Sequence, residues 1–237
     1  MSEPAAEALR ALSQFLVADA PFGDTLQRVA EISVEAVPGA RFAGITMLDE
    51  EERATTAVFT DQEAPAIDQA QYDAGRGPCL DAWRRKAVVR IDDMRSTSPE
   101  YAEFARACLD RGVRSSLSLP LVAADHGIGA LNFYGGEAAA FTGDDEQLGA
   151  DLATAASAVL ANAVAYWGAY ELGQQMTDAM QSRAVIEQAK GMLMASSPGL
   201  TPDDAFDLLR RASQRENVKL REIAQRVVER RPMSAPE

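Results

Sequence analysis

Hydrophobic side chains recur every three or four positions in the first 37 residues, which is the spacing of a helix with one buried face. Residues 4–18 and 22–37 each show this pattern, so two amphipathic helices are predicted there. Pro38 and Gly39 follow directly, and this pair is expected to end the second helix.

The pattern changes after Gly39 to short apolar or alternating segments that are bounded by turn residues. It predicts two strands, over residues 40–49 and 53–60, joined by an acidic turn, and then a region with a short helix and a loop over 61–86. A strand over 87–91, a helix over 98–112 and two strands over 113–123 and 127–135 follow. Ser98 is the expected N-cap of that helix, with Pro99 next. This order predicts an α+β fold with an antiparallel sheet and helices on one face.

One long helix is predicted from Thr142, its expected N-cap, to a break at residues 197–199. Residues 152–170 carry no charge, and their number is almost enough to cross a membrane. Alanine is abundant there, however, and no basic cluster flanks the segment to set an orientation. We therefore expect a buried, alanine-rich helix and no membrane contact.

A four-and-three repeat of mostly apolar residues runs along this helix. Its members are Leu148, Leu152, Ala155, Val159, Asn162, Tyr166, Ala169, Gly173, Met176 and Met180, which we call the seam. Such a seam predicts a coiled coil and a homodimer, with Asn162 helping to fix the register. The alternative is that the same residues pack against the sheet of their own chain.

Two shorter amphipathic helices are predicted after the break. The first is expected to have Thr201 as its N-cap and Pro202 at its first position, and to bury Phe206 in its apolar face. The second is expected to be capped by Asn217. Together with residues 182–196, these helices can close a small three-helix core.

Charge divides the chain into an acidic and a basic part, within a net charge of −13. Residues 1–171 include 13 basic and 27 acidic side chains, whereas residues 172–237 include 10 and 9. Between Ala205 and Arg231 the balance is 8 basic to 4 acidic. Because phosphate is repelled by the first part and attracted by the last helices, nucleic-acid binding is expected only near the C-terminus.

Side chains suited to catalysis or metal binding are few. The chain has two cysteines, Cys79 and Cys108, and one histidine, His126, which falls in a predicted turn. These residues provide neither a disulfide framework nor a zinc site. The sequence contains no nucleophile–histidine pair and no glycine-rich phosphate loop. We therefore expect a protein that is not an enzyme, has no evident cofactor or metal, and works in a reducing cytoplasm.

The C-terminal region carries the most specific pattern. The run SRAVIEQAKGMLMAS, followed by LTPDDAFDLLRRASQRENVKLREIAQRVV, resembles the ANTAR family of RNA-binding antiterminator domains. The resemblance implies that residues 175–233 bind paired RNA stem-loops and prevent a transcription terminator from forming. The candidate RNA-binding residues are Arg183, Gln188, Lys190, Gly191, Arg210, Arg211, Lys219, Arg221 and Arg226.

Gly191 needs an explanation, because glycine inside a helix costs roughly 1 kcal/mol relative to alanine. One explanation is close approach of RNA beside Arg183 and Lys190, which lie two turns apart on one helical face. The other is close packing under the second helix of the bundle. Stacking of RNA bases on aromatic rings is not expected, because no aromatic residue follows Phe206, which is assigned to the core.

The upstream stretch GRGPCLDAWRRKAVVRIDDM is similar to the GAF domains of GAF–ANTAR regulators. This resemblance implies a small-molecule sensor over residues 1–165, joined to the ANTAR region by a connecting helix over residues 142–182 that overlaps both. The ligand is not indicated. Arg76 and Cys79 are weak candidates. Arg76 could hold an anion or be a plain loop charge. Cys79, in a loop-like stretch, could act as a redox or thiol sensor, but a buried cysteine is the commoner outcome.

The sequence thus favours a cytoplasmic, homodimeric regulator that senses a signal and binds RNA. Two alternatives stay open. The last two helices, with their short connection, could form a DNA-binding helix-turn-helix. They could also recruit a protein partner to a dimeric scaffold.

Overall fold

The structure is a computed structural model that describes residues 3–15, 20–48, 51 and 53–229. The chain divides into two compact units, Met1–Trp167 and Gly168–Glu237, each with a hydrophobic core. The helix α6 (Gly143–Ser196) begins in the first unit and ends in the second.

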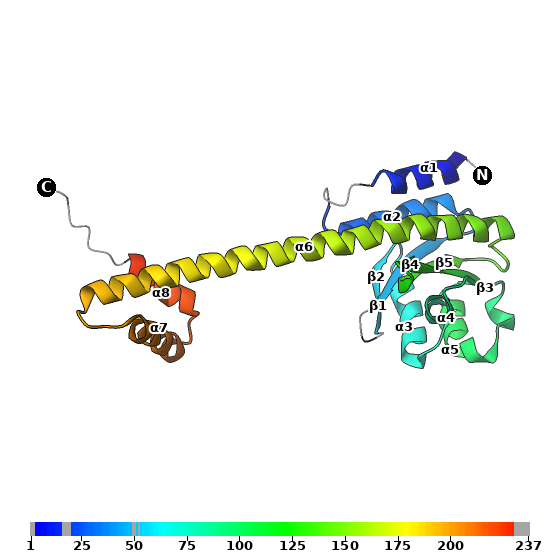
Figure 1. The fold of residues 1–237 in the computed structure, drawn as a ribbon. Helices are drawn as coiled ribbons and strands as arrows, with labels where there is room; N and C mark the ends of the chain where they lie inside the picture. The colour runs from blue at the N-terminus through cyan, green and yellow to red at the C-terminus, as the bar shows by residue number, and fades with distance from the viewer. Residues whose placement is uncertain (1–2, 16–19, 49–50, 52, 230–237) are drawn as a thin grey trace. The chain divides into compact units, whose positions relative to one another are not determined.

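The first unit is built on one antiparallel sheet of five strands in the order β2-β1-β5-β4-β3 (Figure 1). The strands are β1 (Phe42–Leu48), β2 (Ala54–Phe59), β3 (Val89–Ile91), β4 (Ser115–Ala123) and β5 (His126–Gly135). The helices besides α6 are α1 (Glu3–Ser13), α2 (Phe22–Ala36), α3 (Ala64–Ala74), α4 (Pro78–Arg85) and α5 (Ala102–Leu109), with short 3-10 turns η2 (Met94–Ser96) and η3 (Pro99–Tyr101). The predicted α+β fold with an antiparallel sheet is confirmed.

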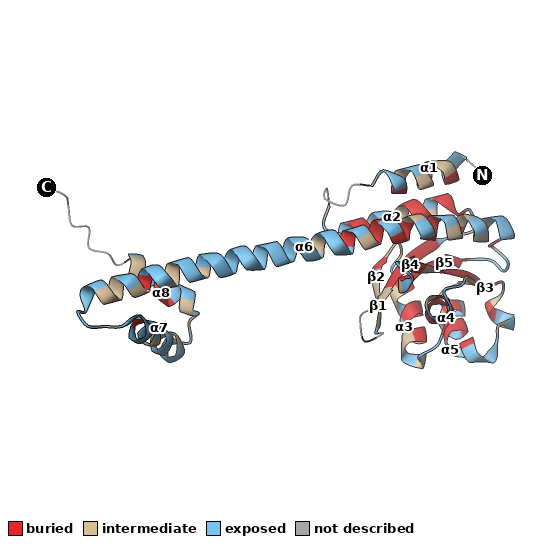
Figure 2. Cartoon of the chain, viewed as in Figure 1, coloured by how far each residue is buried: buried red, intermediate tan, exposed pale blue. Residues whose placement is uncertain are grey.

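Helices cover both faces of this sheet, so the prediction that they lie on one face was wrong (Figure 2). Strand alternation sends Leu117 and Leu131 into an apolar core with α2 and the first part of α6. The opposite face, with Phe42 and Tyr134, packs under α3 and α5. Both faces are buried, which matters because polar side chains on the second face are then enclosed.

Two helices occupy the region 61–86, where one short helix and a loop were predicted. Gly75 ends α3 with a left-handed backbone (φ 65°), which glycine adopts without steric cost. Pro78 then lies in the first turn of α4. Cys79 is therefore helical and not in a loop. With only eight residues, α4 is too short to show a clear helical repeat in the sequence.

Ser98 is the N-cap that the sequence predicted, although it precedes the 3-10 turn η3, which leads directly into α5, and Asn217 is not an N-cap. The Ser98 side chain does not cap this turn, because its hydroxyl donates to the Glu100 carboxylate (3.1 Å). Asn217 ends the preceding helix in the left-handed conformation (φ 52°), which asparagine tolerates better than most residues. The first predicted helix also ends earlier than expected, at Ser13, and residues 16–19 lie outside the described part of the chain.

The long helix α6 is continuous over 54 residues. Thr142 caps it as predicted: its hydroxyl accepts from the Asp145 N–H (3.3 Å), and the Asp145 carboxylate accepts from the Thr142 N–H (2.9 Å). Among the described helices, α6 alone is long and apolar enough to cross a membrane, yet 44% of its most apolar window is buried inside the protein. This burial fits a helix that packs on the sheet of its own chain.

The seam divides at Asn162 into a buried half and an exposed half. Leu152 and Val159 are 0% and 7% exposed in the core of the first unit, so the coiled-coil prediction was wrong for this half. Beyond that point the seam residues are exposed, with Met176 at 60% and Met180 at 71%. Only the second half is available to a partner.

The second unit is a bundle of the end of α6 with α7 (Pro202–Glu216) and α8 (Leu220–Glu229). Its buried centre consists of Ala189, Leu209, Ile223 and Ala224. Thr201 caps α7 as predicted, because its hydroxyl accepts from the Asp204 N–H (3.2 Å). Phe206 is a correction: its side chain is 38% exposed and lies outside that buried centre.

Candidate nucleic-acid interface and sensor interior

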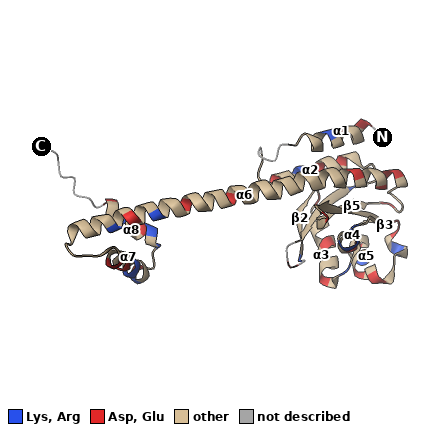
Figure 3. Ribbon diagram, in the orientation of Figure 1, with Lys and Arg blue, Asp and Glu red and all other residues tan. Residues whose placement is uncertain are grey.

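The predicted RNA-binding cations come from every element of the second unit (Figure 3). Arg183 and Lys190 lie on α6, Arg210 and Arg211 on α7, Arg221 and Arg226 on α8, and Lys219 in the link before α8. Arg210 pairs with Asp207 (2.8 Å), and Arg226 with Glu216 (2.8 Å). Within the described part of the chain, no ion pair is formed by Arg183, Arg211, Lys219 or Arg221, which we call the four unpaired cations. These four can contact phosphate without first breaking a salt bridge.

Lys190 differs from the unpaired cations in its surroundings. Its ammonium group lies 2.9 Å from the Glu187 carboxylate one turn earlier on α6, and only 15% of its side chain is exposed. An RNA phosphate would therefore compete with Glu187 for Lys190. Arg183, two turns earlier on the same helix, is exposed.

Gly191 lies on the outer surface of α6 with open space around it. A Cβ added there would meet nothing within 4 Å, which rules out close packing under the second helix as the reason for glycine. Gln188, one turn earlier, is also exposed. Close approach of a partner is the other explanation for Gly191, and it stays a prediction.

A polar cluster that the sequence analysis missed is buried between α3, α4 and the sheet. Its members are Thr46, Thr56, Asp68, Gln71, Tyr72, Cys79, Asn132 and Tyr134, which we call the interior polar cluster. Asp68 is at its centre. Its carboxylate accepts hydrogen bonds from the Tyr134 hydroxyl, the Gln71 amide (3.0 Å) and the Thr56 hydroxyl (2.8 Å). Each of the three donors is neutral.

Thr46 is the second centre of this cluster. Its hydroxyl oxygen lies 2.8 Å from the Tyr72 hydroxyl, 3.1 Å from the Asn132 amide nitrogen and 3.2 Å from the Cys79 sulfur. The Gln71 amide oxygen accepts from the Cys79 N–H (3.0 Å). These bonds connect α3 and α4 to β1 and β5. A substitution or a bound guest at one member would therefore alter the hydrogen bonds of four elements.

Burial dominates the electrostatics of the interior polar cluster. Loss of water raises the pKa of Asp68 to about 6, although its three hydrogen bonds oppose the shift. Burial also raises the pKa of the Cys79 thiol to about 12 and that of Cys108 well above its usual value. Both thiols are therefore protonated at neutral pH, and a thiolate nucleophile is disfavoured.

The two ligand candidates from the sequence are separated in the structure. Cys79 belongs to the interior polar cluster, whereas Arg76 is exposed at the turn between α3 and α4. Two buried oxygens, Asn132 Oδ1 within the cluster and Ser116 Oγ outside it, have no hydrogen-bond partner among the described residues. The register places Ser116 on the same sheet face as Asn132, one strand away. This face thus retains acceptors for a polar guest or water.

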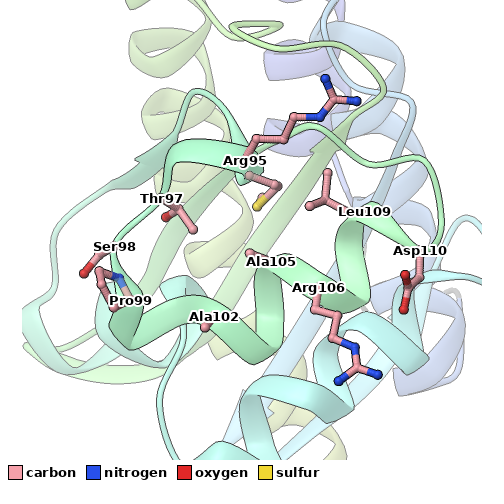
Figure 4. Close-up of a pocket in the computed structure, with 10 residues that line it drawn as sticks. Arg95, Thr97, Ser98, Pro99, Ala102, Ala105, Arg106, Leu109 and Asp110 are labelled. Carbon is pink, nitrogen blue, oxygen red and sulfur yellow. The ribbon is translucent and has the colours of Figure 1, made fainter.

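A separate surface cavity of about 460 Å³ lies beside η2 and α5 (Figure 4). Arg95 and Arg106 line it, but their side chains extend away from each other. Leu109 and Ala105 supply apolar surface between them. No pair of cations converges on one point, so this cavity is not a built anion site.

The sequence did contain a signal for the interior polar cluster. Asp68, Gln71 and Tyr72 follow helical spacing with the apolar Ile67, which indicates polar groups at the edge of a buried face. In β5, Asn132 alternates with apolar residues that face the other core. Polar residues at both kinds of position would have indicated an enclosed polar site.

Solved structures share the fold of the first unit. A free methionine-R-sulfoxide reductase from Neisseria meningitidis, in complex with its substrate, is 23% identical with a TM-score of 0.53, and the match covers 69% of this chain and 93% of that one. A fRMsr from Staphylococcus aureus in reduced form is 15% identical with a TM-score of 0.52, over 66% and 94%. The GAF domain of an Acinetobacter phosphoenolpyruvate-protein phosphotransferase is 15% identical with a TM-score of 0.51, over 70% and 97%. These identities show the fold alone. No curated protein matches the sequence.

Two domain families match the sequence itself. The GAF domain family matches residues 19–161, which include the sheet and the interior polar cluster. The ANTAR domain family matches residues 174–228, which include the four unpaired cations. This order confirms the architecture that the sequence predicted. The chain therefore belongs to the GAF domain family and carries an ANTAR domain after its sensor fold.

Proposed function

We propose that this protein binds paired stem-loops in nascent RNA and prevents transcription terminators from forming, in response to a signal received by its GAF domain. The ANTAR match supports RNA as the target class. The observation that carries the proposal is the set of four unpaired cations on a small bundle, in a chain whose remainder is strongly acidic. Each of them can neutralise a phosphate at little cost to the fold.

The GAF domain acts in this proposal as a sensor and not as an enzyme, although two proteins of similar fold are reductases. Cys79 and Cys108 are the thiols of the chain, and burial keeps both protonated. The interior polar cluster offers hydrogen-bonding groups without a reactive nucleophile. It suits recognition of a small polar molecule, and the proposal requires no cofactor or metal.

The protein is proposed to act as a homodimer in the cytoplasm. The exposed half of the seam, with Tyr166 at 42%, Met176 at 60% and Met180 at 71% exposure, supports contact with a second copy. The buried half of α6 packs on its own sheet, which supports a helix that stays out of the membrane.

The test is a binding comparison with the full-length protein. Affinity for a paired stem-loop RNA and for duplex DNA of matched length would be measured over a salt series, with the RNA taken from transcripts that crosslink to the protein in its host. Tighter, salt-dependent binding of the RNA is expected. Preference for the duplex would instead support a helix-turn-helix regulator, and absence of salt-dependent binding would support a protein scaffold.

A further inference from the structure

We infer that a groove between α6 and α8 of the ANTAR domain holds one unpaired RNA base that carries an amino group. The inference rests on the proposed function, because it assumes RNA as the partner. It adds where the RNA sequence is read and by which side chains. Six polar residues line this groove, namely Asp178, Gln181, Ser182, Arg221, Glu222 and Gln225.

The groove is formed by one face of each helix. On α6, Asp178, Gln181 and Ser182 are followed by Val185, and steps of three and four residues place all of them on one side. Val185 also packs against the core of the bundle and gives the groove an apolar floor. The volume of about 290 Å³ is at the lower end of small-molecule sites, which suits a single base.

Five of the six polar side chains of the groove make no hydrogen bond or ion pair with the residues that the structure describes. No side-chain hydrogen bond or ion pair joins Asp178, Arg221 or Glu222 to another residue that the structure describes, and the same holds for Gln181 and Ser182. Gln225 donates to the Glu229 carboxylate (2.8 Å), which leaves its amide oxygen as an acceptor. Opposite charges thus line one groove without neutralising each other.

The charge of the lining selects a base and not a phosphate. Asp178 and Glu222 outweigh Arg221, so a phosphate group inside the groove would be repelled. Carboxylates accept hydrogen bonds from the amino groups of cytosine, adenine and guanine, and uracil has no such group. The two glutamine amides and the Ser182 hydroxyl can pair with the remaining donors and acceptors of a base edge.

The groove is continuous with the proposed RNA surface. Arg221 is one of the four unpaired cations, and it can hold the phosphate next to an inserted base. Gln188 lies seven residues after Gln181, two turns along the same face of α6, and Gly191 follows one turn later with open space above it. An RNA strand that passes Gly191 can therefore reach the groove.

The experiment uses the full-length protein and paired stem-loop RNAs with identical stems. One RNA has loops of uridine only, and the other has loops of cytidine only. The wild type should bind the cytidine loops more tightly, on the order of tenfold. The double variant Asp178→Ala with Glu222→Ala should lose this preference. A matched control, Glu171→Ala with Asp203→Ala, removes two exposed carboxylates outside the groove and should keep it.

The possible results distinguish a failure of the groove inference from a failure of the proposed function. Both double variants change the net charge equally, so a general gain in RNA affinity should be common to both. A wild type that binds RNA without preferring cytidine loops, or a groove variant that keeps the preference, overturns the inference and leaves the proposed function standing. A wild type that binds neither RNA contradicts the proposed function itself.

Discussion

The two domains place their polar chemistry in opposite locations. In the GAF domain, Asp68 is completely buried, and neutral donors from other parts of the fold satisfy it. In the ANTAR domain, cations such as Arg211 are exposed and unpaired. A buried network responds to a guest or a proton by changing its own bonds, whereas an exposed cation binds a partner without changing the fold. In the function that we propose, sensing corresponds to the interior of the first domain and RNA binding to the surface of the second.

The helix α6 shows the same contrast within one element, because the first half of its seam is buried and the second half is exposed. Truncation of a side chain in the buried half should have the largest effect on the free energy of unfolding. Leu152→Ala should lower the free energy of unfolding of the GAF domain by about 2–5 kcal/mol, because the side chain is fully buried. Met176→Ala, on the exposed half of the seam, should change it by less than about 0.5 kcal/mol. Urea denaturation followed by circular dichroism measures both, and equal effects would show that the two halves do not differ.

The exposed half of the seam should instead control assembly. Met176→Glu with Met180→Glu should convert a dimer into a monomer without unfolding the GAF domain, because charges in a helix contact are costly to desolvate. Light scattering coupled to gel filtration reports the mass. A wild-type protein with the mass of one chain would show that the exposed half of the seam does not form a dimer.

Ionisation of Asp68 should give the next largest effect. Its folded pKa of about 6 exceeds the ordinary 3.8, so the folded state binds the proton more tightly and loses stability as pH rises from about 3.8 to about 6. The loss should amount to roughly 3 kcal/mol. Asp68→Asn removes the ionisable group. The variant should therefore gain stability relative to wild type between pH 4 and pH 7 by about this amount.

A control on the same helix sharpens this test. Asp73 is exposed on α3, and Asp73→Asn should show no comparable gain over that pH range. Chemical denaturation at several pH values provides the comparison. If the difference between Asp68→Asn and wild type did not vary with pH, the carboxyl would titrate normally and the buried cluster would not perturb it.

The ion pairs within the ANTAR domain should determine how much each cation contributes to RNA binding. Arg211→Ala should weaken binding to a paired stem-loop RNA and reduce the salt dependence by about one unit of slope. Arg210→Ala should have less effect, because Arg210 is already paired with Asp207. Neither change should alter the thermal midpoint much. Equal losses would show that internal pairing does not decide which cations contact RNA.

Gly191 should give the smallest effect on folding. Gly191→Ala should raise stability by up to ~1 kcal/mol, because a Cβ has open space there, and it should weaken RNA binding if RNA approaches closely. Gly168→Ala, on the same helix and also in open space, should raise stability without affecting RNA binding. Destabilisation by Gly191→Ala would show a packing role after all.

Features set by neighbours along the chain were predictable from the sequence. The continuous helix after Thr142, the strand pair around residue 125 and the cap at Thr201 depend on short-range spacing and local hydrogen bonds. The bond between Asp68 and Tyr134 joins residues 66 positions apart, and no local pattern contains it. Such contacts are fixed only when α3 packs on the sheet.

The errors at Phe206 and in the seam have one physical origin. Phe206 follows helical spacing within a wide apolar face, but only part of that face is covered in a bundle of three short helices. Leu152 and Met180 belong to one repeat, yet only the first has a sheet beneath it. Spacing indicates which residues share a face, and tertiary packing decides which faces are covered.

The most direct test of the account removes the four unpaired cations together. The full-length variant with Arg183, Arg211, Lys219 and Arg221 all changed to Ala would be compared with wild type for binding to a paired stem-loop RNA over a salt series, after circular dichroism confirms its fold. The account predicts salt-dependent binding by wild type and, in the variant, a salt slope smaller by roughly three to four units. A folded variant that binds RNA with the affinity and salt dependence of wild type would contradict it.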